Sequence, residues 1–282
     1  MSKILDGKAV SASVKENVAR DVSELKKDGI DVGLAVILVG DNSASKIYVE
    51  NKKKACEATG IKSFQYLLEE NTTQDELISL IKTLNGEKSV HGILCQLPLP
   101  SHIDEKAVIA AISPEKDVDA FHISNVGKIM VGSFDFLPCT PSGIIEILDY
   151  YGIRVEGKNC VVIGRSNIVG KPMAMLLLHR NGTVTICHSK TENLTEITKN
   201  ADILISAVGK AQFVTADMVK DGAVVIDVGM NRENGKLCGD VCFDEVSKKA
   251  EYITPVPGGV GPMTIAMLLK NTVTAARKQN GR

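Results

Sequence analysis

The segment that determines the fold of this chain runs from Gly157 to Ser189 and reads GKNCVVIGRSNIVGKPMAMLLLHRNGTVTICHS. Its apolar run from Cys160 to Ile163 has the composition of a strand that is buried on both faces. A glycine-rich turn follows, then a helical run over Met173–Leu178, and then a second apolar run over Thr183–Cys187. This order of strand, turn, helix and strand predicts a parallel βαβ unit.

The turn between the first strand and the helix has residues suited to binding phosphate. Gly164 permits a sharp bend and the close approach of a ligand, and Gly170 allows the helix to pack near the sheet. Backbone N–H groups at the start of a helix carry a partial positive charge, which favours a pyrophosphate. The match to G-x-G-x-x-G is incomplete, because Ser166 replaces the second glycine and Gly170 comes one residue late. Alone, the turn fits a nucleotide site and a plain βα connection equally well.

The residues after the second strand distinguish between the two nicotinamide cofactors. NAD enzymes usually carry an acidic residue there, which binds the ribose 2′-hydroxyl. This chain has His188, Ser189 and Lys190, with Arg165 in the preceding turn. A hydroxyl and cations would hold a 2′-phosphate, which a carboxylate would repel. The pattern therefore favours NADP; the alternative is that Arg165 and Lys190 are solvated surface charges.

Composition excludes several functional classes. The chain has 282 residues and a net charge of −1, so there is no electrostatic case for binding nucleic acid or an anionic membrane. No apolar run approaches the length of a membrane span, and the N-terminus lacks the apolar region of a signal peptide. The seven cysteines include no pair at a usual metal spacing, and we expect reduced thiols in a cytoplasmic protein without a metal site.

Strands and helices alternate along the chain, which predicts parallel sheets covered by helices on both faces. Thr73 and Glu76 form a capping box for a helix that ends near Leu84. We expect the segment from Pro114 to Pro141 to be a loop-rich connection. Further helices are expected at 10–25, 44–58, 141–150 and 264–278, and further strands at 34–39, 61–68, 90–95, 203–208 and 224–228. Gly209 and Gly229 follow the last two strands, so they are predicted to border a ligand at the carboxyl ends of the sheet.

Four polar residues could carry chemistry in the first half of the chain. Tyr48 and Lys52 lie four residues apart, so they share one helix face and could orient a water or move a proton. Gln96 follows a strand and precedes two prolines, which could aim its amide into a cleft. Asp119, or its neighbour Asp117, could accept hydrogen bonds from a heterocycle. Each residue also has a plain alternative as an exposed helix, strand-end or loop residue.

Six motifs in one order resemble those of the bacterial bifunctional methylenetetrahydrofolate dehydrogenase/methenyltetrahydrofolate cyclohydrolase family, over nearly the whole chain. They are 39–45 with Tyr48 and Lys52, 92–100, 114–119, 138–141, 164–172 and 255–264. The resemblance implies oxidation of 5,10-methylenetetrahydrofolate with NADP and hydrolysis of the methenyl product to 10-formyltetrahydrofolate. These reactions belong to one-carbon metabolism, which supplies purine, methionine and histidine synthesis.

The resemblance also implies a fold class. It is an α/β chain with two domains and a substrate cleft between them. The N-terminal three-layer α/β catalytic domain would comprise residues 1–138, joined by the C-terminal helix 262–282. A Rossmann-like NADP-binding domain with a parallel sheet would comprise residues 139–261. A homodimer formed through the cofactor domain is expected on the same basis.

The roles of individual residues follow from the matching motifs. Lys52 would be the principal catalytic residue, Tyr48 would stack on the folate, and Gln96 would hydrogen-bond Lys52. Asp119 would bind the pterin ring as the fourth residue of the catalytic set. The folate cleft would also be lined by Leu97, Pro257, Gly258 and Gly261. NADP would be bound by Gly164, Arg165, Ser166, Ser189 and the main chain of Met230.

Two positions depart from the family pattern. Ala120 stands where the family usually has glycine, and it would be strained by about 1 kcal/mol if its φ is positive. Met230 stands where isoleucine is common, but a main-chain contact would survive that change.

Two other functions remain open from the sequence. One is another two-domain NADP-dependent dehydrogenase, acting on a small hydroxy or amino acid, which would need a positive anchor for the substrate carboxylate. The other is a nucleotide-sensing module that binds NADP without folate turnover.

Overall fold

The computed structural model describes residues 2–233 and 235–282, with the side chains of Ser43 and Ala44 left out. The chain forms two compact units. The six-stranded unit contains Met1–Ala12 and Pro138–Thr264, and the three-stranded unit contains Ser13–Leu137 and Ile265–Arg282. The limits predicted from the sequence for the folding domains, 1–138 with 262–282 and 139–261, remain a prediction. The chain passes between the units within α1 (Gly7–Lys27), between Leu137 and Pro138, and within α10 (Val260–Gln279).

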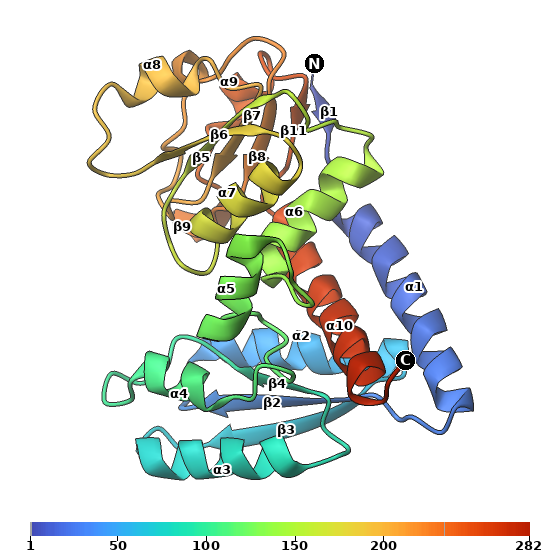
Figure 1. The fold of residues 1–282 in the computed structure, drawn as a ribbon. Coiled ribbons are helices and arrows are strands. Elements are labelled where there is room, and N and C mark those ends of the chain that lie inside the picture. Colours follow the sequence, from blue (N-terminus) through green and yellow to red (C-terminus); the bar gives the residue numbers. More distant parts are fainter. Residues whose placement is uncertain (1, 234) are drawn as a thin grey trace. The chain divides into compact units, whose positions relative to one another are not determined.

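The three-stranded unit is a parallel sheet between helices. Its strands β2 (Gly33–Val39), β3 (Lys62–Leu68) and β4 (Gly92–Cys95) have the order β3-β2-β4. Helices α2 (Ser43–Thr59) and α3 (Gln74–Gly86) cover opposite faces of this sheet (Figure 1). Every residue of β2 is buried, as its continuous apolar run predicted. Alternate side chains of β2 pack with Leu77, Ile81 and Leu84 of α3 in one apolar core.

The capping box that begins α3 is present. The hydroxyl of Thr73 accepts a hydrogen bond from the backbone N–H of Glu76, at 3.3 Å. The carboxylate of Glu76 in turn accepts from the backbone N–H of Thr73, at 2.8 Å. Two of the N–H groups left unpaired at a helix start are therefore satisfied by residues close in sequence.

The prediction of a loop over Pro114–Pro141 was wrong for its central part. Helix α5 spans Ile123–Val131, begins after His122 as N-cap and ends at Gly132, which has φ 75°. Ile129 is buried, whereas Ile123, Met130 and Val131 are 65–80% exposed. The helix has only nine residues and contains Gly127, a poor helix former, so its sequence is a weak helix signal. A second short helix that the sequence did not reveal, α4 (Glu105–Ala111), begins at the N-cap Asp104.

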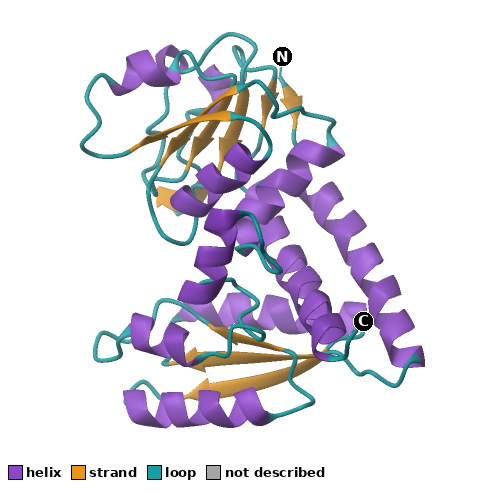
Figure 2. Cartoon of the chain, viewed as in Figure 1, coloured by secondary structure: helices purple, strands orange, loops and turns teal. Residues whose placement is uncertain are grey.

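The six-stranded unit is a parallel sheet of order β1-β11-β8-β7-β5-β6. Figure 2 shows its strands with helices on both faces. Helices α8 and α9 belong to the core on one face, and α6 and α7 cover the other (Figure 1). The strands are β1 (Lys3–Ile4), β5 (Asn159–Ile163), β6 (Thr183–Cys187), β7 (Ile203–Ser206), β8 (Val224–Asp227) and β11 (Tyr252–Ile253). The helices are α6 (Cys139–Tyr150), α7 (Gly170–His179), α8 (Leu194–Thr198) and α9 (Phe243–Val246), with a 3₁₀ turn at Ala216–Met218. The βαβ unit predicted from Gly157–Ser189 is therefore confirmed as β5-α7-β6.

Some elements of this unit were not predicted. Strands β1 and β11 are two residues long, too short for a sequence pattern, and they pair with each other. An antiparallel hairpin, β9 (Asn231–Glu233) with β10 (Lys236–Cys238), follows β8. Helix α10 begins at Val260, four residues before the predicted start.

All seven cysteines lie within the described residues, and none is in a disulfide bond. No helix of the described residues combines the length and the apolarity needed to cross a membrane.

Candidate functional site

Lys52 and Gln96 meet at the carboxyl end of the three-stranded sheet. Lys52 lies on α2 and is half-buried, and Gln96 directly follows β4. The Nζ of Lys52 donates to Oε1 of Gln96 at 2.6 Å, which is the hydrogen bond expected from the sequence. The Nε2 of Gln96 donates to the carbonyl of Leu97 at 2.7 Å, so the orientation of the amide is fixed from its other end. Tyr48, one turn before Lys52 on α2, is also half-buried.

The loop that carries Asp119 lies along β4. The N–H of Ile93 donates to the carbonyl of Lys116 at 2.8 Å, and Ile93 and Asp117 form a parallel bridge. Parallel alignment with β4 places Asp119 near the end of that strand. Its charge raises the pKa of the Cys95 thiol, although burial is the larger cause and brings that pKa to about 12. Cys95 is therefore a protonated, apolar neighbour of the site and not a nucleophile.

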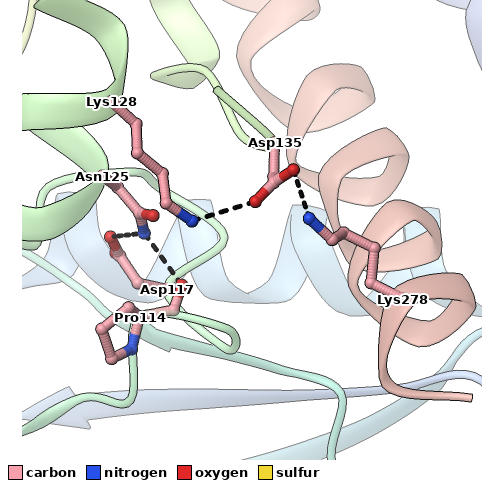
Figure 3. A network of polar contacts seen from close by, with 6 residues as sticks. All are labelled: Pro114, Asp117, Asn125, Lys128, Asp135 and Lys278. Carbon is pink, nitrogen blue, oxygen red and sulfur yellow. Dashed lines mark hydrogen bonds and ion pairs between the residues drawn. The ribbon is translucent and has the colours of Figure 1, made fainter. Parts of the chain in front are cut away.

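Asp117 holds this loop by accepting backbone and side-chain hydrogen bonds (Figure 3). Its Oδ2 accepts from Asn125 Nδ2 and from the N–H of His122, both at 2.8 Å. Asn125 also donates to the carbonyl of Pro114 at 2.9 Å and so closes the loop on α5. Burial raises the pKa of Asp117, and these hydrogen bonds oppose that rise. Asp117 thus fixes the backbone of the loop beside Asp119.

Two residues of α10 bind the segments before and after α5 within the three-stranded unit. Asn271 donates to the carbonyls of Val118 and Leu137, both at 2.8 Å. Lys278 and Lys128 both form ion pairs with Asp135 (Figure 3). The sequence did not indicate Asn125 or Asn271, because their partners are distant along the chain.

Ala120 has the backbone conformation that the sequence led us to test. Its φ is 57°, and its side chain is fully buried. The left-handed conformation costs a residue with a Cβ about 1 kcal/mol, and the surrounding hydrogen bonds offset this strain.

The glycine-rich turn of the six-stranded unit is confirmed in its geometry. Gly164 has φ 131°, and a Cβ on Gly170 would lie 2.2 Å from the carbonyl oxygen of Gly164. Both glycines are therefore required, Gly164 by conformation and by space and Gly170 by space.

Ser166 has a role that the sequence did not reveal. Its hydroxyl accepts hydrogen bonds from the N–H groups of Val169 and Gly170, at 3.1 and 3.3 Å. The first N–H groups of α7 are thus bound by this side chain, whereas the sequence predicted that they face a pyrophosphate. Ser166 is exposed, so a ligand can still reach its hydroxyl.

The charged residues expected at a ribose phosphate have the required exposure. Arg165 is exposed in the turn after β5, and Ser189 and Lys190 are exposed after β6. The N–H of Lys190 donates to His188 Nδ1 at 3.2 Å, and the N–H of His188 donates to Thr191 Oγ1 at 2.9 Å. These local bonds fold the turn and leave the Ser189 hydroxyl and both cations accessible. The donors present fit a phosphorylated dinucleotide.

The remaining predicted residues lie in the six-stranded unit. Pro257 is exposed, and Gly258 is buried with φ 110°. Gly261 lies in the first turn of α10, where Met230 Sδ would be 3.6 Å from a Cβ. Met230 is 52% exposed. Tyr48, Lys52, Gln96, Leu97 and Asp119 belong to the three-stranded unit.

No group of three residues that could hold a metal ion occurs among the residues that the structure describes.

The fold and these residues define a class of two-unit α/β protein. One unit is a doubly wound parallel sheet with a glycine-rich turn, and the other is a smaller parallel sheet with a lysine–glutamine pair at its carboxyl end. Comparison with known families then identifies the particular family. Residues 5–119 match the tetrahydrofolate dehydrogenase/cyclohydrolase catalytic domain, and residues 138–280 match the NAD(P)-binding domain of the same family. The chain belongs to the tetrahydrofolate dehydrogenase/cyclohydrolase family.

Individual relatives are similar over their full length. The bifunctional protein FolD of Acetivibrio thermocellus is 62% identical over 99% of this chain and 98% of its own. The crystal structure of the bifunctional enzyme FolD from Campylobacter jejuni is 55% identical, covers 99% of this chain and 100% of its own, and has a TM-score of 0.97. The enzyme of Trypanosoma brucei, solved with NADP cofactor and inhibitor, is 40% identical over 100% of this chain and 99% of its own, with a TM-score of 0.95.

Proposed function

We propose that this chain oxidises 5,10-methylenetetrahydrofolate with NADP and hydrolyses the methenyl product to 10-formyltetrahydrofolate, with Lys52 as the principal catalytic residue. The observation that carries this assignment is the hydrogen bond of 2.6 Å from Lys52 to Gln96 at the end of β4. Membership of the tetrahydrofolate dehydrogenase/cyclohydrolase family supplies the class of reaction. The reactions belong to one-carbon metabolism.

The first reaction depends mainly on alignment. Lone pairs on the two nitrogens that flank the methylene carbon stabilise the cation left when hydride departs. NADP supplies the hydride acceptor when it is bound. Tyr48 would stack on the folate and Asp119 would bind the pterin ring, with Leu97, Pro257, Gly258 and Gly261 as further folate contacts. Gly164, Arg165, Ser166, Ser189 and the main chain of Met230 would hold NADP.

The second reaction needs an oriented water and a proton acceptor. Gln96 is anchored to the carbonyl of Leu97 and receives an N–H of Lys52, so it fixes where the Lys52 nitrogen lies. In this proposal Lys52, as the neutral amine, receives the proton as water adds to the methenyl carbon. The bond from that carbon to N5 then breaks and the proton passes to N5, which leaves 10-formyltetrahydrofolate. The same residues serve both reactions because the intermediate need not leave.

Two properties of the assembly belong to the same proposal. We expect a homodimer formed through the cofactor-binding unit and a cytoplasmic location, without nucleic-acid or membrane partners. The net charge of −1 supports the absence of nucleic-acid binding.

A single absorbance experiment tests the function. Purified protein is mixed with 5,10-methylenetetrahydrofolate and NADP, and NADPH and the methenyl species are followed together. NADPH formation with little accumulation of the methenyl species supports both activities. Accumulation of the methenyl species would contradict the hydrolytic half, and a lack of NADPH would contradict the oxidative half.

A further inference from the structure

Two buried aspartates lie beside the carboxyl ends of β7 and β8, in the six-stranded unit. Asp227 is the last residue of β8 and is 4% exposed, and Asp240 follows the β9–β10 hairpin and is 0% exposed. A carboxylate is costly to bury unless its oxygens accept hydrogen bonds. The hydrogen-bond donors that contact these two carboxylates therefore indicate which part of the backbone each carboxylate holds.

Asp240 accepts hydrogen bonds from the turn that follows β7. Its Oδ2 accepts from the N–H of Val208 at 2.8 Å, and also from the Gly209 N–H and the Ser206 hydroxyl, both at 3.2 Å. Its Oδ1 accepts from the N–H of Lys210 at 2.9 Å and from Asn231 Nδ2 at 3.0 Å. Three consecutive backbone N–H groups thus point inward at one side chain, which fixes the path of the turn.

Asp227 accepts hydrogen bonds from the segment that follows β8. Its Oδ1 accepts from the N–H groups of Gly229 and Asp240, and its Oδ2 accepts from the N–H of Val241, all at 2.9 Å. Asp240 lies 13 residues after Asp227, so these bonds close the base of the excursion that contains Gly229, Met230 and the hairpin.

The packing around both carboxylates has no room for further atoms. A Cβ on Gly239 would lie 1.8 Å from Asp227 Oδ2, and a Cβ on Gly229 would lie 2.2 Å from Asp240 Oδ1. Glycine at these two positions allows the backbone to contact the carboxylates directly.

The turn that Asp240 holds borders the glycine-rich turn, and the segment that Asp227 holds follows β8, the strand on the other side of β7. A Cβ on Gly164 would lie 2.5 Å from the carbonyl oxygen of Ala207, the first residue after β7. The turn bound by Asp240 therefore forms one wall against which Gly164 is placed. Ligands of open parallel sheets bind beyond these strand ends.

We propose that Asp227 and Asp240 are positioning residues for the nicotinamide dinucleotide: they fix the backbone at 207–210 and 228–231, and thereby the shape of the site beside Gly164. The inference rests on the proposed function, since it takes this edge of the sheet as the NADP site. A role in cofactor placement predicts a selective defect, in which NADP binding weakens while hydrolysis of methenyltetrahydrofolate, which consumes no NADP, is retained. A merely structural role predicts that both activities fall together with the folded fraction.

The test compares Asp240→Asn, which alters the turn after β7, with a matched change at a residue just before β7. Asparagine keeps the shape of the side chain but turns an N–H₂ group toward at least two donors. The control is Asp202→Asn, because Asp202 precedes β7 and accepts from the N–H of Asn159 at 2.8 Å and from Lys220. A milder variant, Asn231→Ala, removes one donor to Asp240 from a half-buried residue and guards against misfolding of the first variant. NADP dissociation constants, KM for both substrates and hydrolysis rates are measured on protein shown to be folded by circular dichroism.

We expect the dissociation constant and KM for NADP to rise about tenfold or more in Asp240→Asn and about threefold in Asn231→Ala. KM for folate and the hydrolysis rate stay within about twofold, and Asp202→Asn binds NADP as the unaltered chain does. Unchanged NADP binding in Asp240→Asn, or in Asn231→Ala if the former does not fold, would overturn the inference. An equal loss of oxidation and hydrolysis in Asp240→Asn would also overturn the inference. Failure of the unaltered chain to bind NADP would instead refute the proposed function, and the inference with it.

Discussion

The loop at Asp119 and the turns at the ends of β7 and β8 are both organised by buried aspartates, but they differ at the residues that make this possible. Beside Asp117, Ala120 takes the left-handed conformation with φ 57°, and its methyl group is accommodated. Beside Asp227 and Asp240, Gly239 and Gly229 leave no space for a Cβ. The first constraint is conformational, and alanine satisfies it at a modest cost. The second is steric, and only glycine satisfies it.

The largest expected effect concerns the chemistry that the Asp119 loop borders. Lys52→Met should reduce hydrolysis of the methenyl substrate by about 10²–10⁴-fold, because it removes the proton acceptor. Folate and NADP should still bind, which equilibrium titration measures. Lys54→Met, an exposed change on the same helix, is the control and should be neutral. Retained hydrolysis in Lys52→Met would exclude Lys52 as the catalytic residue.

A change at Gly239 tests the steric half of the comparison. Gly239→Ala places a Cβ 1.8 Å from Asp227 Oδ2, so backbone or carboxylate must move, and we expect a loss of about 3 kcal/mol or more in the free energy of unfolding. Chemical denaturation provides the measurement. Gly222→Ala is matched, since Gly222 has φ 77° and open space around it and should lose only about 1 kcal/mol. Equal losses in the two variants would show that space is not the constraint at Gly239.

Titration of Asp227 tests the electrostatic side of the same site. Burial, with a smaller contribution from the charge of Asp240, raises the pKa of Asp227 to about 6, against three backbone N–H groups that lower it. Because this pKa is above the value of the unfolded chain, the stability that Asp227 contributes is fully present below about pH 4 and is lost as pH rises through about 6. Carbon-13 NMR of labelled aspartates, assigned with Asp227→Asn, should show a titration midpoint near 6. A midpoint at the unfolded value of 3.8 would contradict the burial argument.

The smallest effect is expected at Ala120. Ala120→Gly relieves the left-handed strain of about 1 kcal/mol but removes a buried methyl group and increases the freedom of the unfolded chain. These contributions oppose one another, so the free energy of unfolding should change by less than about 1 kcal/mol. Ala19→Gly within α1 has no strain to relieve and should cost about 1 kcal/mol. A stabilisation of Ala120→Gly well above 1 kcal/mol would show that the loop is more strained than its hydrogen bonds indicate.

Local chemistry explains which parts of the fold the sequence revealed. The capping box of Thr73 and Glu76 and the turn at Gly164 depend on residues within a few positions of one another. Helix α5 was missed because it has only nine residues and contains Gly127, a poor helix former.

Contacts between residues distant in sequence explain what remained unseen in the candidate site. The bond between Lys52 and Gln96 was expected only from resemblance to the family, since 44 positions separate them. Nothing near Asp227 in the sequence indicates Asp240, because the bonds between them form only after the β9–β10 hairpin has folded back. Ser166 takes the place of the second glycine of the G-x-G-x-x-G pattern, but its hydroxyl binds the start of α7, which only the structure shows.

The most direct test of the division between the two regions is a crossed kinetic measurement on Asp117→Asn and Asp240→Asn. Asp117→Asn disturbs the bonds to His122 and Asn125, and it should raise KM for folate about tenfold in both reactions while KM for NADP stays unchanged. Asp240→Asn should instead raise KM for NADP about tenfold while KM for folate stays unchanged. Asp104→Asn, an exchange of two good N-cap residues in the three-stranded unit, serves as the control. If both aspartate variants raised both KM values alike, the claim that each carboxylate network positions its own ligand would be contradicted.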